Sequence, residues 1–213
     1  KCLHCGAVQR LYRAVTILRL HMRAIARHPI GFCGFESGPS DPRLERTVDA
    51  MGVPQMRIMI LRSVSREERT LRFHTDSRSI KAAQLHHNAA TSVLIYDPTA
   101  KVQIRISGKA EFSSQGDIAN TAWSTSTPFA RRCYMAEVAP GTPIAEPSSG
   151  LPTWIEGKQP DEAQLADYRE NFAALLVKVE TIEWLYLANA GHRRARWHWD
   201  AGQNVWAGCW LIP

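Results

Sequence analysis

Cationic and hydroxyl side chains recur between residues 57 and 111, where the expected strands end or turn. Arg57 and Arg62 bracket an apolar strand, and the segment from His74 to Lys81 adds hydroxyls and two more cations. A phosphate dianion taken partly out of water needs Arg, Lys, Ser or Thr donors in fixed geometry. Neither G-x-G-x-x-G nor G-x-x-x-x-G-K-S/T occurs, which excludes the dinucleotide-fold and P-loop modes of phosphate binding. The sequence therefore predicts a phosphorylated ligand held by side chains on a β scaffold.

Other chemistries lack their sequence signatures. Cys2 and Cys5 with His4 resemble half of a zinc knuckle, but no second pair of ligands follows at a suitable spacing, so no metal site is expected. No G-x-S-x-G occurs and no cysteine lies in a recognisable nucleophile context, which argues against a serine or cysteine hydrolase. Cys133 and Cys209 are expected to be small core residues.

The net charge of +6 could indicate nucleic-acid binding. The basic residues are spread along the chain, however, from Arg10 to Arg196, and no motif for groove or single-strand recognition accompanies them. A solvated basic face and an anionic cofactor explain the charge with fewer assumptions, so no nucleic-acid partner is expected.

The 213 residues suffice for one domain with a substantial core. No apolar run approaches the ~20 residues that a membrane-spanning helix needs, so no membrane partner is expected. Five cysteines at irregular spacing do not make a disulfide framework, which favours a reducing, cytoplasmic location.

The pattern of apolar residues and of turn residues predicts the elements that position these groups. A helix at 7–27 and a loop at 31–42 form an N-terminal segment, 1–42, ahead of a domain at 43–213. In that domain we expect strands at 44–50, 54–64, 70–75, 91–96, 101–112, 176–187, 193–199 and 205–212. Helices are expected at 79–88, at 117–138 with a break near Pro128, and at 161–175 with Asp161 as N-cap, and a proline-rich surface loop at 140–160.

The strand at 101–112 alternates clearly between an apolar and a polar face. Val102, Ile104 and Ile106 share one face, whereas Gln103 and Arg105 lie on the other. Such alternation is typical of a strand with one face in a core. Many strands, few helices and no regular β-α alternation predict an antiparallel barrel rather than a doubly wound sheet.

Four segments carry motifs in a fixed order along the chain. The segment from Gly52 to Arg62 is similar to G-x-P-x-x-R-x-V-x-L-R/K, and that from Phe73 to Lys81 to F-x-T-x-x-x-S-x-K. The stretch 88–111 is the third, and Glu183-Trp184 with 192–197 is the fourth. Together they resemble the pyridoxamine 5′-phosphate oxidase superfamily of FMN-binding split β-barrels, and the resemblance spans 44–213. It implies a mainly β (α+β) antiparallel split barrel with peripheral helices, with FMN at the interface of a homodimer.

The resemblance also implies roles for individual residues. Arg57 and Lys81 would bind the FMN phosphate, and the backbone of residues 58–60 would face the ring edge. In the family, the equivalent of Gln103 contacts the flavin from the partner subunit. The full expected cofactor-binding set is Arg57, Ile58, Met59, Ile60, Arg62, His74, Thr75, Arg78, Ser79, Lys81, Gln103, Trp184 and Arg196. Taken singly, Arg57, Lys81 and Gln103 also suit solvated surface positions.

The family's oxidases hold a substrate phosphate with Lys, Tyr, Arg and Ser, and place an Arg-Leu-His motif over the flavin. Here the Lys position is Arg62, Trp123 stands in the Tyr region, and the motif's His falls on Ala195 or is deleted. Arg193 and Arg194 are the expected substrate contacts. These departures favour an FMN-dependent oxidoreductase of uncertain substrate, in which a small, phosphorylated molecule is one option. A non-enzymatic flavin-binding or sensing dimer, and a barrel with a purely structural role, remain the alternatives.

Overall fold

The computed structural model describes residues 41–213, so the expected helix at 7–27 and the Cys2–Cys5 segment lie outside the described residues, and the domain division after residue 42 stays a prediction. Eight strands are present in this part of the chain: β1 Asp41–Val48, β2 Pro54–Ser65, β3 Thr70–Asp76, β4 Ala90–Asp97, β5 Val102–Ser113, β6 Phe172–Tyr186, β7 Arg193–Asp200 and β8 Val205–Leu211. The helices are α2 Ile80–His87, α3 Gly116–Ser124, α4 Pro128–Arg131 and α5 Glu162–Ala166, with 3-10 turns η1 Arg132–Met135 and η2 Arg169–Asn171.

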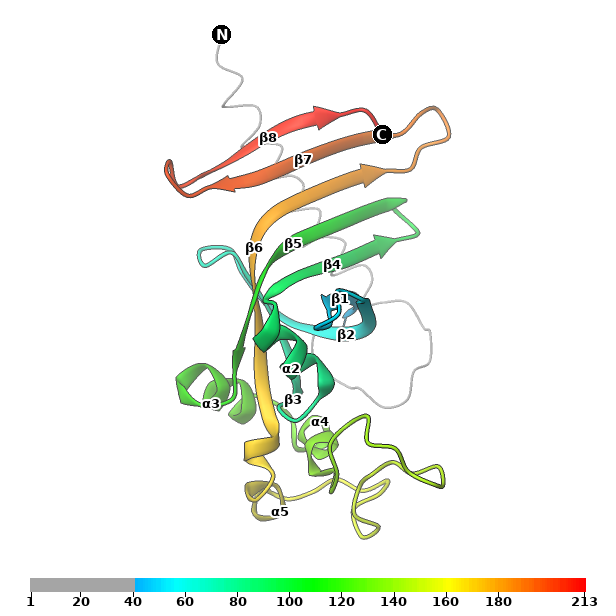
Figure 1. Ribbon diagram of the computed structural model, residues 1–213, viewed down its shortest axis with the longest axis vertical. Helices are drawn as coiled ribbons and strands as arrows, with labels where there is room; N and C mark the ends of the chain where they lie inside the picture. Colours follow the sequence, from blue (N-terminus) through cyan, green and yellow to red (C-terminus); the bar gives the residue numbers. More distant parts are fainter. Residues whose placement is uncertain (1–40) are drawn as a thin grey trace.

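All pairs among these strands are antiparallel, in the order β3-β2-β1-β4-β5-β6-β7-β8. An additional pairing of β3 with β6 closes the first six strands of this order into a barrel, while β7 and β8 extend the sheet beyond it (Figure 1). The predicted antiparallel split barrel with peripheral helices is confirmed.

One long strand, β6, makes the split possible. Its first half pairs with β3 up to Lys178, and its second half pairs with β7 from Thr181 onward. Between these two halves of β6, the pairing of β6 with β5 shifts register at Gly108, which marks a β-bulge. At this bulge β6 exchanges β3 for β7 as its second neighbour. A Cβ on Gly108 would lie 1.9 Å from the Lys178 carbonyl oxygen, so only glycine lets the two backbones approach this closely.

The main core fills the barrel with the inward row of each strand. Its fully buried members include Phe73, Val93 and Leu175, and the predicted inward face of 101–112 is confirmed, because Val102, Ile104 and Ile106 all belong to the core. Burying one such side chain contributes roughly 1.5–3 kcal/mol.

A smaller second layer, formed by α3 and η1, covers the outer face of the first half of β6 (Figure 1). The ring of Phe172 makes edge-on contacts with Tyr134 and Trp123, at centroid distances of 5.0 and 5.4 Å. The helix predicted at 117–138 with a break near Pro128 is confirmed as far as Met135, because α3, α4 and η1 follow one another with a break before Pro128, whereas 136–138 are not helical. No helix in the described part of the chain is both long and apolar enough to cross a membrane.

The helix expected at 161–175 is present only in its first part. Its cap is confirmed: Asp161 accepts from the Gln164 backbone at 2.8 Å in a capping box. The prediction is wrong for the last part, because α5 ends at Ala166 and Phe172 begins β6. Phe172 is paired with β3, and the four buried residues that begin this strand are covered on both faces.

The expectation that two cysteines lie in the core is also wrong. Cys133 and Cys209 are both exposed free cysteines. Cys133 belongs to η1 and Cys209 to β8, the edge strand outside the closed barrel, so neither side chain is surrounded by the main core.

Candidate functional site

The inward row of the barrel becomes polar at one end. Glu45 of β1 pairs in register with Arg57 of β2 on one side and with Val93 of β4 on the other. Because paired residues share a face of the sheet, Glu45 and Arg57 point to the same side as the buried Val93. Thr47 and Thr91 continue the row, and both are buried. We call these four side chains, together with Thr75, Ser79, Lys81 and Gln84, the barrel mouth.

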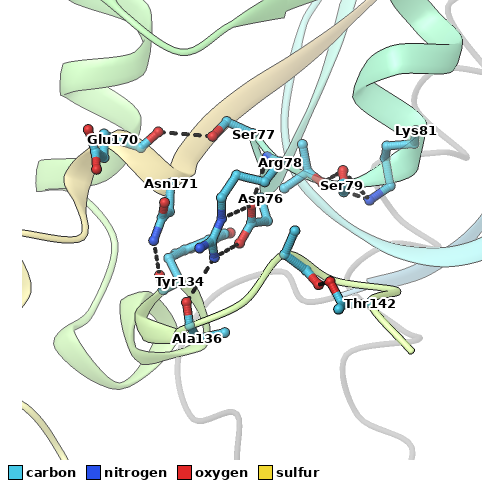
Figure 2. Close-up of polar contacts among 12 residues, drawn as sticks. Asp76, Ser77, Arg78, Ser79, Lys81, Tyr134, Ala136, Thr142, Glu170 and Asn171 are labelled. Carbon is cyan, nitrogen blue, oxygen red and sulfur yellow. Dashed lines mark hydrogen bonds and ion pairs between the residues drawn. The ribbon is translucent and has the colours of Figure 1, made fainter. Parts of the chain in front are cut away.

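The turn between β3 and α2 adds a cation and two hydroxyls to the barrel mouth. Lys81 Nζ donates to Thr75 Oγ1 at 2.7 Å and to Ser79 Oγ at 3.4 Å, and the two hydroxyl oxygens are 3.5 Å apart. Figure 2 shows Ser79 and Lys81 together on one side of this turn. Thr75 and Ser79 are buried, whereas Lys81 is half-buried. These three side chains form a cradle of donors.

Local backbone geometry aims this cradle. Ser79 is the N-cap residue of α2, yet its hydroxyl makes no capping bond and instead faces Thr75 and Lys81. The first turn of α2 also contains no acidic side chain. A helix N-terminus presents unpaired backbone N–H groups and a positive dipole end, which together favour an anion.

Arg57 lies in the barrel mouth on a network of acceptors. Its Nη1 donates to Glu45 Oε2 at 3.0 Å, and its Nη2 donates to Thr47 Oγ1 at 2.9 Å and to Gln84 Oε1 at 3.1 Å. Gln84 comes from α2, which contacts β1 and β5. Three of the five guanidinium N–H groups are thus used, and the position of the planar fork is fixed by three side chains.

The charges in the barrel mouth perturb one another. Burial lowers the pKa of Lys81, and the nearby charge of Arg57 lowers it further, against the opposing carboxylates of Glu45 and Asp76. Burial also raises the pKa of Glu45 and outweighs the attraction of Arg57 and Lys81. Two cations held close together and partly out of water are stabilised by an anion between them. The residues present therefore fit a phosphate group, which is the ligand expected from the sequence.

Arg78 belongs to the same turn but has a different environment. Its guanidinium makes two hydrogen bonds to the Asp76 carboxylate, at 2.7 and 3.0 Å, and a third to the Ala136 carbonyl at 3.0 Å. In Figure 2 this pair lies on the other side of the turn from Lys81. Arg78 therefore ties the turn to the segment after η1.

His74 and Arg62 lie outside the barrel mouth, on the outer face of β3 and β2. The His74 ring makes an edge-on contact with Phe172 at 5.0 Å, and its Nε2 is buried without a hydrogen-bond partner among the described residues. Burial lowers the pKa of His74 to about 3, helped by the charges of Arg62 and Arg72. The imidazole is therefore neutral at pH 7.

The segment 58–60 divides between two environments. Met59 is in the main core, whereas Ile58 is 73% exposed on the outer face of β2. Ile60, two residues further along the strand, shares the outer face with Ile58. Side chains of this strand therefore cannot all face one ligand, and only the backbone of 58–60 is common to both faces.

The remaining expected residues lie on β5, β6 and β7. Gln103 pairs with Tyr96 and Leu185 on the outer face, whereas Trp184 lies on the core side and stacks on Tyr186 at 6.1 Å. Arg57 is inward-facing and three strands away from Gln103, or roughly 14 Å across the sheet at about 4.8 Å per strand. Within one chain these residues do not converge with the barrel mouth.

Glu183 organises the arginines of this second region. It accepts from Arg105 at 2.9 Å and from Arg194 Nε at 2.7 Å, and Arg196 lies 3.7 Å away. The Arg105, Arg194, Arg196 and Glu183 side chains are called the Glu183 cluster below. Arg193 instead donates to the carbonyls of Gly191 and His192. Arg193 and Arg194 thus point to opposite faces of β7.

The sequence interpretation missed Glu45, Thr47, Gln84 and Thr91, which complete the barrel mouth. A signal for Glu45 was available, because Glu45 and Arg57 are equally far from Met51 at the hairpin turn, and the observed register pairs them. Gln84 and Thr91 have no such local signal, since they reach the barrel mouth through the packing of α2 and β4.

Comparisons with known proteins agree with this geometry. Residues 43–114 match the family model described as pyridoxamine 5′-phosphate oxidase, FMN-binding domain. A pyridoxine/pyridoxamine 5′-phosphate oxidase of Shewanella woodyi is 29% identical over 180 residues, which cover 78% of this chain and 76% of that protein.

Two solved structures share the fold. A pyridoxamine 5′-phosphate oxidase-related, FMN-binding protein of Nostoc punctiforme has a TM-score of 0.72 at 22% identity, over 95% of this chain and 97% of that one. PhzG of Burkholderia lata, in complex with tetrahydrophenazine-1-carboxylic acid, has a TM-score of 0.67 at 19% identity, over 94% and 92% of the two chains. The barrel mouth and the matched segment coincide, since 43–114 contains Glu45, Arg57, Thr75, Ser79 and Lys81. Residues 43–114 are therefore similar to the FMN-binding domain of the pyridoxamine 5′-phosphate oxidases, and these similarities point to FMN as the cofactor.

Proposed function

We propose that the protein is an FMN-dependent oxidoreductase whose barrel mouth holds the cofactor phosphate. The observation that carries the proposal is the convergence of Arg57, Lys81, Thr75 and Ser79, with Lys81 Nζ 2.7 Å from Thr75 Oγ1. Charge-assisted bonds from Arg and Lys to a phosphate are about twice as strong as neutral ones. Bound FMN supplies hydride-transfer chemistry, while the protein binds, orients and shields it.

We further propose that a second copy of this chain completes the site. Gln103, Trp184 and Arg196 do not converge with Arg57 within one chain, so a common ligand requires them from another. The outer face between the two regions exposes large apolar side chains: Met56 is 64%, Ile58 73% and Tyr96 49% exposed. An exposed apolar patch of this kind is typical of an interaction surface, and a homodimer buries the same patch on both subunits.

The substrate is proposed to be a small anionic molecule. The Glu183 cluster holds three arginines against one carboxylate, which leaves an excess of positive charge on the outer face of β6 and β7. Arg194 belongs to this cluster, and Arg193 lies beside it on β7. Because one relative is named a pyridoxine/pyridoxamine 5′-phosphate oxidase, the 5′-phosphates of these vitamers are the first substrates to test.

The test of cofactor binding is the visible absorption spectrum of the purified protein, with the released cofactor identified by mass. We expect a flavin spectrum and release of FMN. A colourless protein that takes up no added FMN would contradict the proposed site. Reduction of the bound flavin by a vitamer or by a pyridine nucleotide would then separate an oxidoreductase from a protein that only binds flavin.

The dimer is tested by a pair of charge substitutions on the apolar patch. Met56→Asp with Ile58→Asp is expected to give a monomer by analytical ultracentrifugation and to weaken FMN retention. Ile118→Asp on α3 is the matched control, since Ile118 is also exposed (46%) but lies off this face. A doubly substituted protein that remains dimeric would show that the subunits meet elsewhere.

A further inference from the structure

Glu45 is a carboxylate with no solvent exposure in the barrel mouth, and it is not one of the groups proposed to hold the phosphate. Its Oε2 accepts from Arg57 Nη1 at 3.0 Å, and its Oε1 lies 3.5 Å from the Thr91 hydroxyl. A fully buried carboxylate beside a phosphate site is unfavourable when both groups are ionised, because like charges repel strongly out of water.

The charges of the barrel mouth do not match a phosphate while Glu45 is ionised. Arg57 and Lys81 contribute two positive charges and Glu45 one negative charge, which leaves +1 against the −2 of a phosphate dianion. If Glu45 is neutral, the two cations and the dianion balance. The imbalance is one charge, and a single proton removes it.

We propose that Glu45 takes up one proton from solvent when the phosphate of FMN binds, so that this residue couples cofactor affinity to pH. The inference rests on the proposed placement of the phosphate between Arg57 and Lys81. Protonation also weakens the charge-assisted hydrogen bond from Arg57 Nη1 to Glu45, so that this N–H can turn more readily to the phosphate. The Thr91 hydroxyl donates to the Arg46 carbonyl at 2.8 Å and lies 3.5 Å from Glu45 Oε1, so its oxygen can accept the added proton while it keeps the bond to Arg46.

The surroundings of Glu45 support this assignment. Among the described residues, the charged groups that act on it are Arg57 from β2 and Lys81 from α2, while β4 contributes the neutral Thr91. The carboxylate of Asp76, at the end of β3, acts on Lys81 instead. Burial already raises the pKa of Glu45 despite both cations, and a bound dianion raises it further. Burial and the bound dianion therefore both favour proton uptake by Glu45.

The experiment compares FMN affinity across pH in three proteins stripped of cofactor: the native chain, Glu45→Gln and Glu162→Gln. Glutamine keeps the shape of Glu45 but cannot titrate. Glu162 is the matched control, because it too pairs with one arginine, Arg131, but is exposed and lies on α5. Flavin fluorescence gives Kd between about pH 5 and 9, a range that includes the second phosphate ionisation near 6. The ionisation of free FMN is the same for all three proteins and cancels in their ratios.

The expected result is a ratio of native to Glu45→Gln Kd that rises with pH, by up to about tenfold per pH unit, and then levels off. Glu162→Gln should follow the native protein throughout. Riboflavin, which lacks the phosphate, should give a ratio that does not change with pH. A second measurement is the proton uptake on FMN binding, taken by calorimetry in two buffers of different ionisation enthalpy, which Glu45→Gln should reduce.

Other outcomes overturn the proposal in distinguishable ways. A ratio that is constant with pH, in proteins that bind FMN, means that Glu45 does not change its protonation state on binding. This result overturns the proposal but does not contradict the proposed phosphate site. Loss of FMN from Glu45→Gln at every pH means that Glu45 only positions Arg57. A native protein that binds no FMN at any pH overturns the proposed function itself. If Glu45→Gln does not fold, the titration of the Glu45 carboxyl carbon is followed by NMR in the native protein, with and without FMN. A titration midpoint that FMN leaves unchanged overturns the proposal.

Discussion

The barrel mouth and the Glu183 cluster both place a glutamate against arginine on neighbouring strands, yet the two carboxylates behave oppositely. Glu45 has no exposure and its pKa is raised, because burial outweighs Arg57 and Lys81. At Glu183 burial also raises the pKa, but the hydrogen bond from Arg194 and the charges of Arg105 and Arg194 together outweigh it, so the pKa is lowered. Two cations act on each carboxylate, so the difference in burial decides the sign of the pKa shift. Glu183 is held as an anion, whereas burial favours the protonated form of Glu45.

The largest expected effect removes the cations of the barrel mouth. Arg57→Ala with Lys81→Ala should weaken FMN binding by about 10²–10⁴-fold, since each charge-assisted contact is worth roughly 1.5–3 kcal/mol. Flavin titration of the stripped protein measures it. The control is Lys109→Ala with Lys158→Ala, which removes the same charge from two exposed sites. Full flavin occupancy in the first variant would refute the site.

The next largest expected effect is the difference in the free energy of unfolding between the Glu183→Gln and Glu45→Gln variants. Glu183→Gln should lower the free energy of unfolding at pH 7 by about 1–3 kcal/mol, because Arg105 and Arg194 lose a charged partner. Glu45→Gln should cost less or stabilise the cofactor-free protein. The pKa of Glu45 is higher in the folded protein than the 4.5 of the unfolded chain. The stability that protonated Glu45 contributes is therefore fully present below pH 4.5 and is lost as the pH rises through the pKa of the folded protein. Urea unfolding measures both, and a larger loss in Glu45→Gln would contradict the comparison.

Burial also shifts the pKa of His74, which is a base, so its pKa is lowered rather than raised. Its pKa of about 3 lies below the unfolded value of 6.5, so between these values the unfolded chain binds more protons. Stability should therefore be full above pH 6.5 and fall as pH drops, by up to about 1.4 kcal/mol per unit. His74→Gln should show a shallower dependence in urea unfolding between pH 7 and about 5. Equal slopes would mean that His74 binds a proton as readily in the folded protein as in the unfolded chain.

The smallest expected effect comes from the exposed edge of the Glu183 cluster. Arg105 is 48% exposed, so Arg105→Ala should cost less than about 1 kcal/mol in low salt and almost nothing near 1 M salt, where surface charges are screened. Unfolding of both proteins at two ionic strengths tests this. A cost that persists in high salt would show that the pair is shielded from solvent, for example by a partner subunit.

Much of the barrel could be predicted from local pattern. The alternation of Val102, Ile104 and Ile106 indicated the inward face, and Asp161 was correctly placed as a cap. The segment beginning at Phe172 could not be predicted as strand, because an apolar run covered on both faces has no period of two. Its pairing with β3 and β5, distant in sequence, decided its conformation.

The candidate site divides in the same way. The spacing of Thr75, Ser79 and Lys81 across one turn is local, so the order of residues alone brings these donors together. The hairpin register, and with it the Glu45–Arg57 pair, was also available within thirteen residues. By contrast, the burial of Glu45 and the effect of Arg57 on Lys81 follow from tertiary packing. Periodicity and turn chemistry depend on neighbours in the chain, whereas desolvation and the approach of charges depend on elements that only folding brings together.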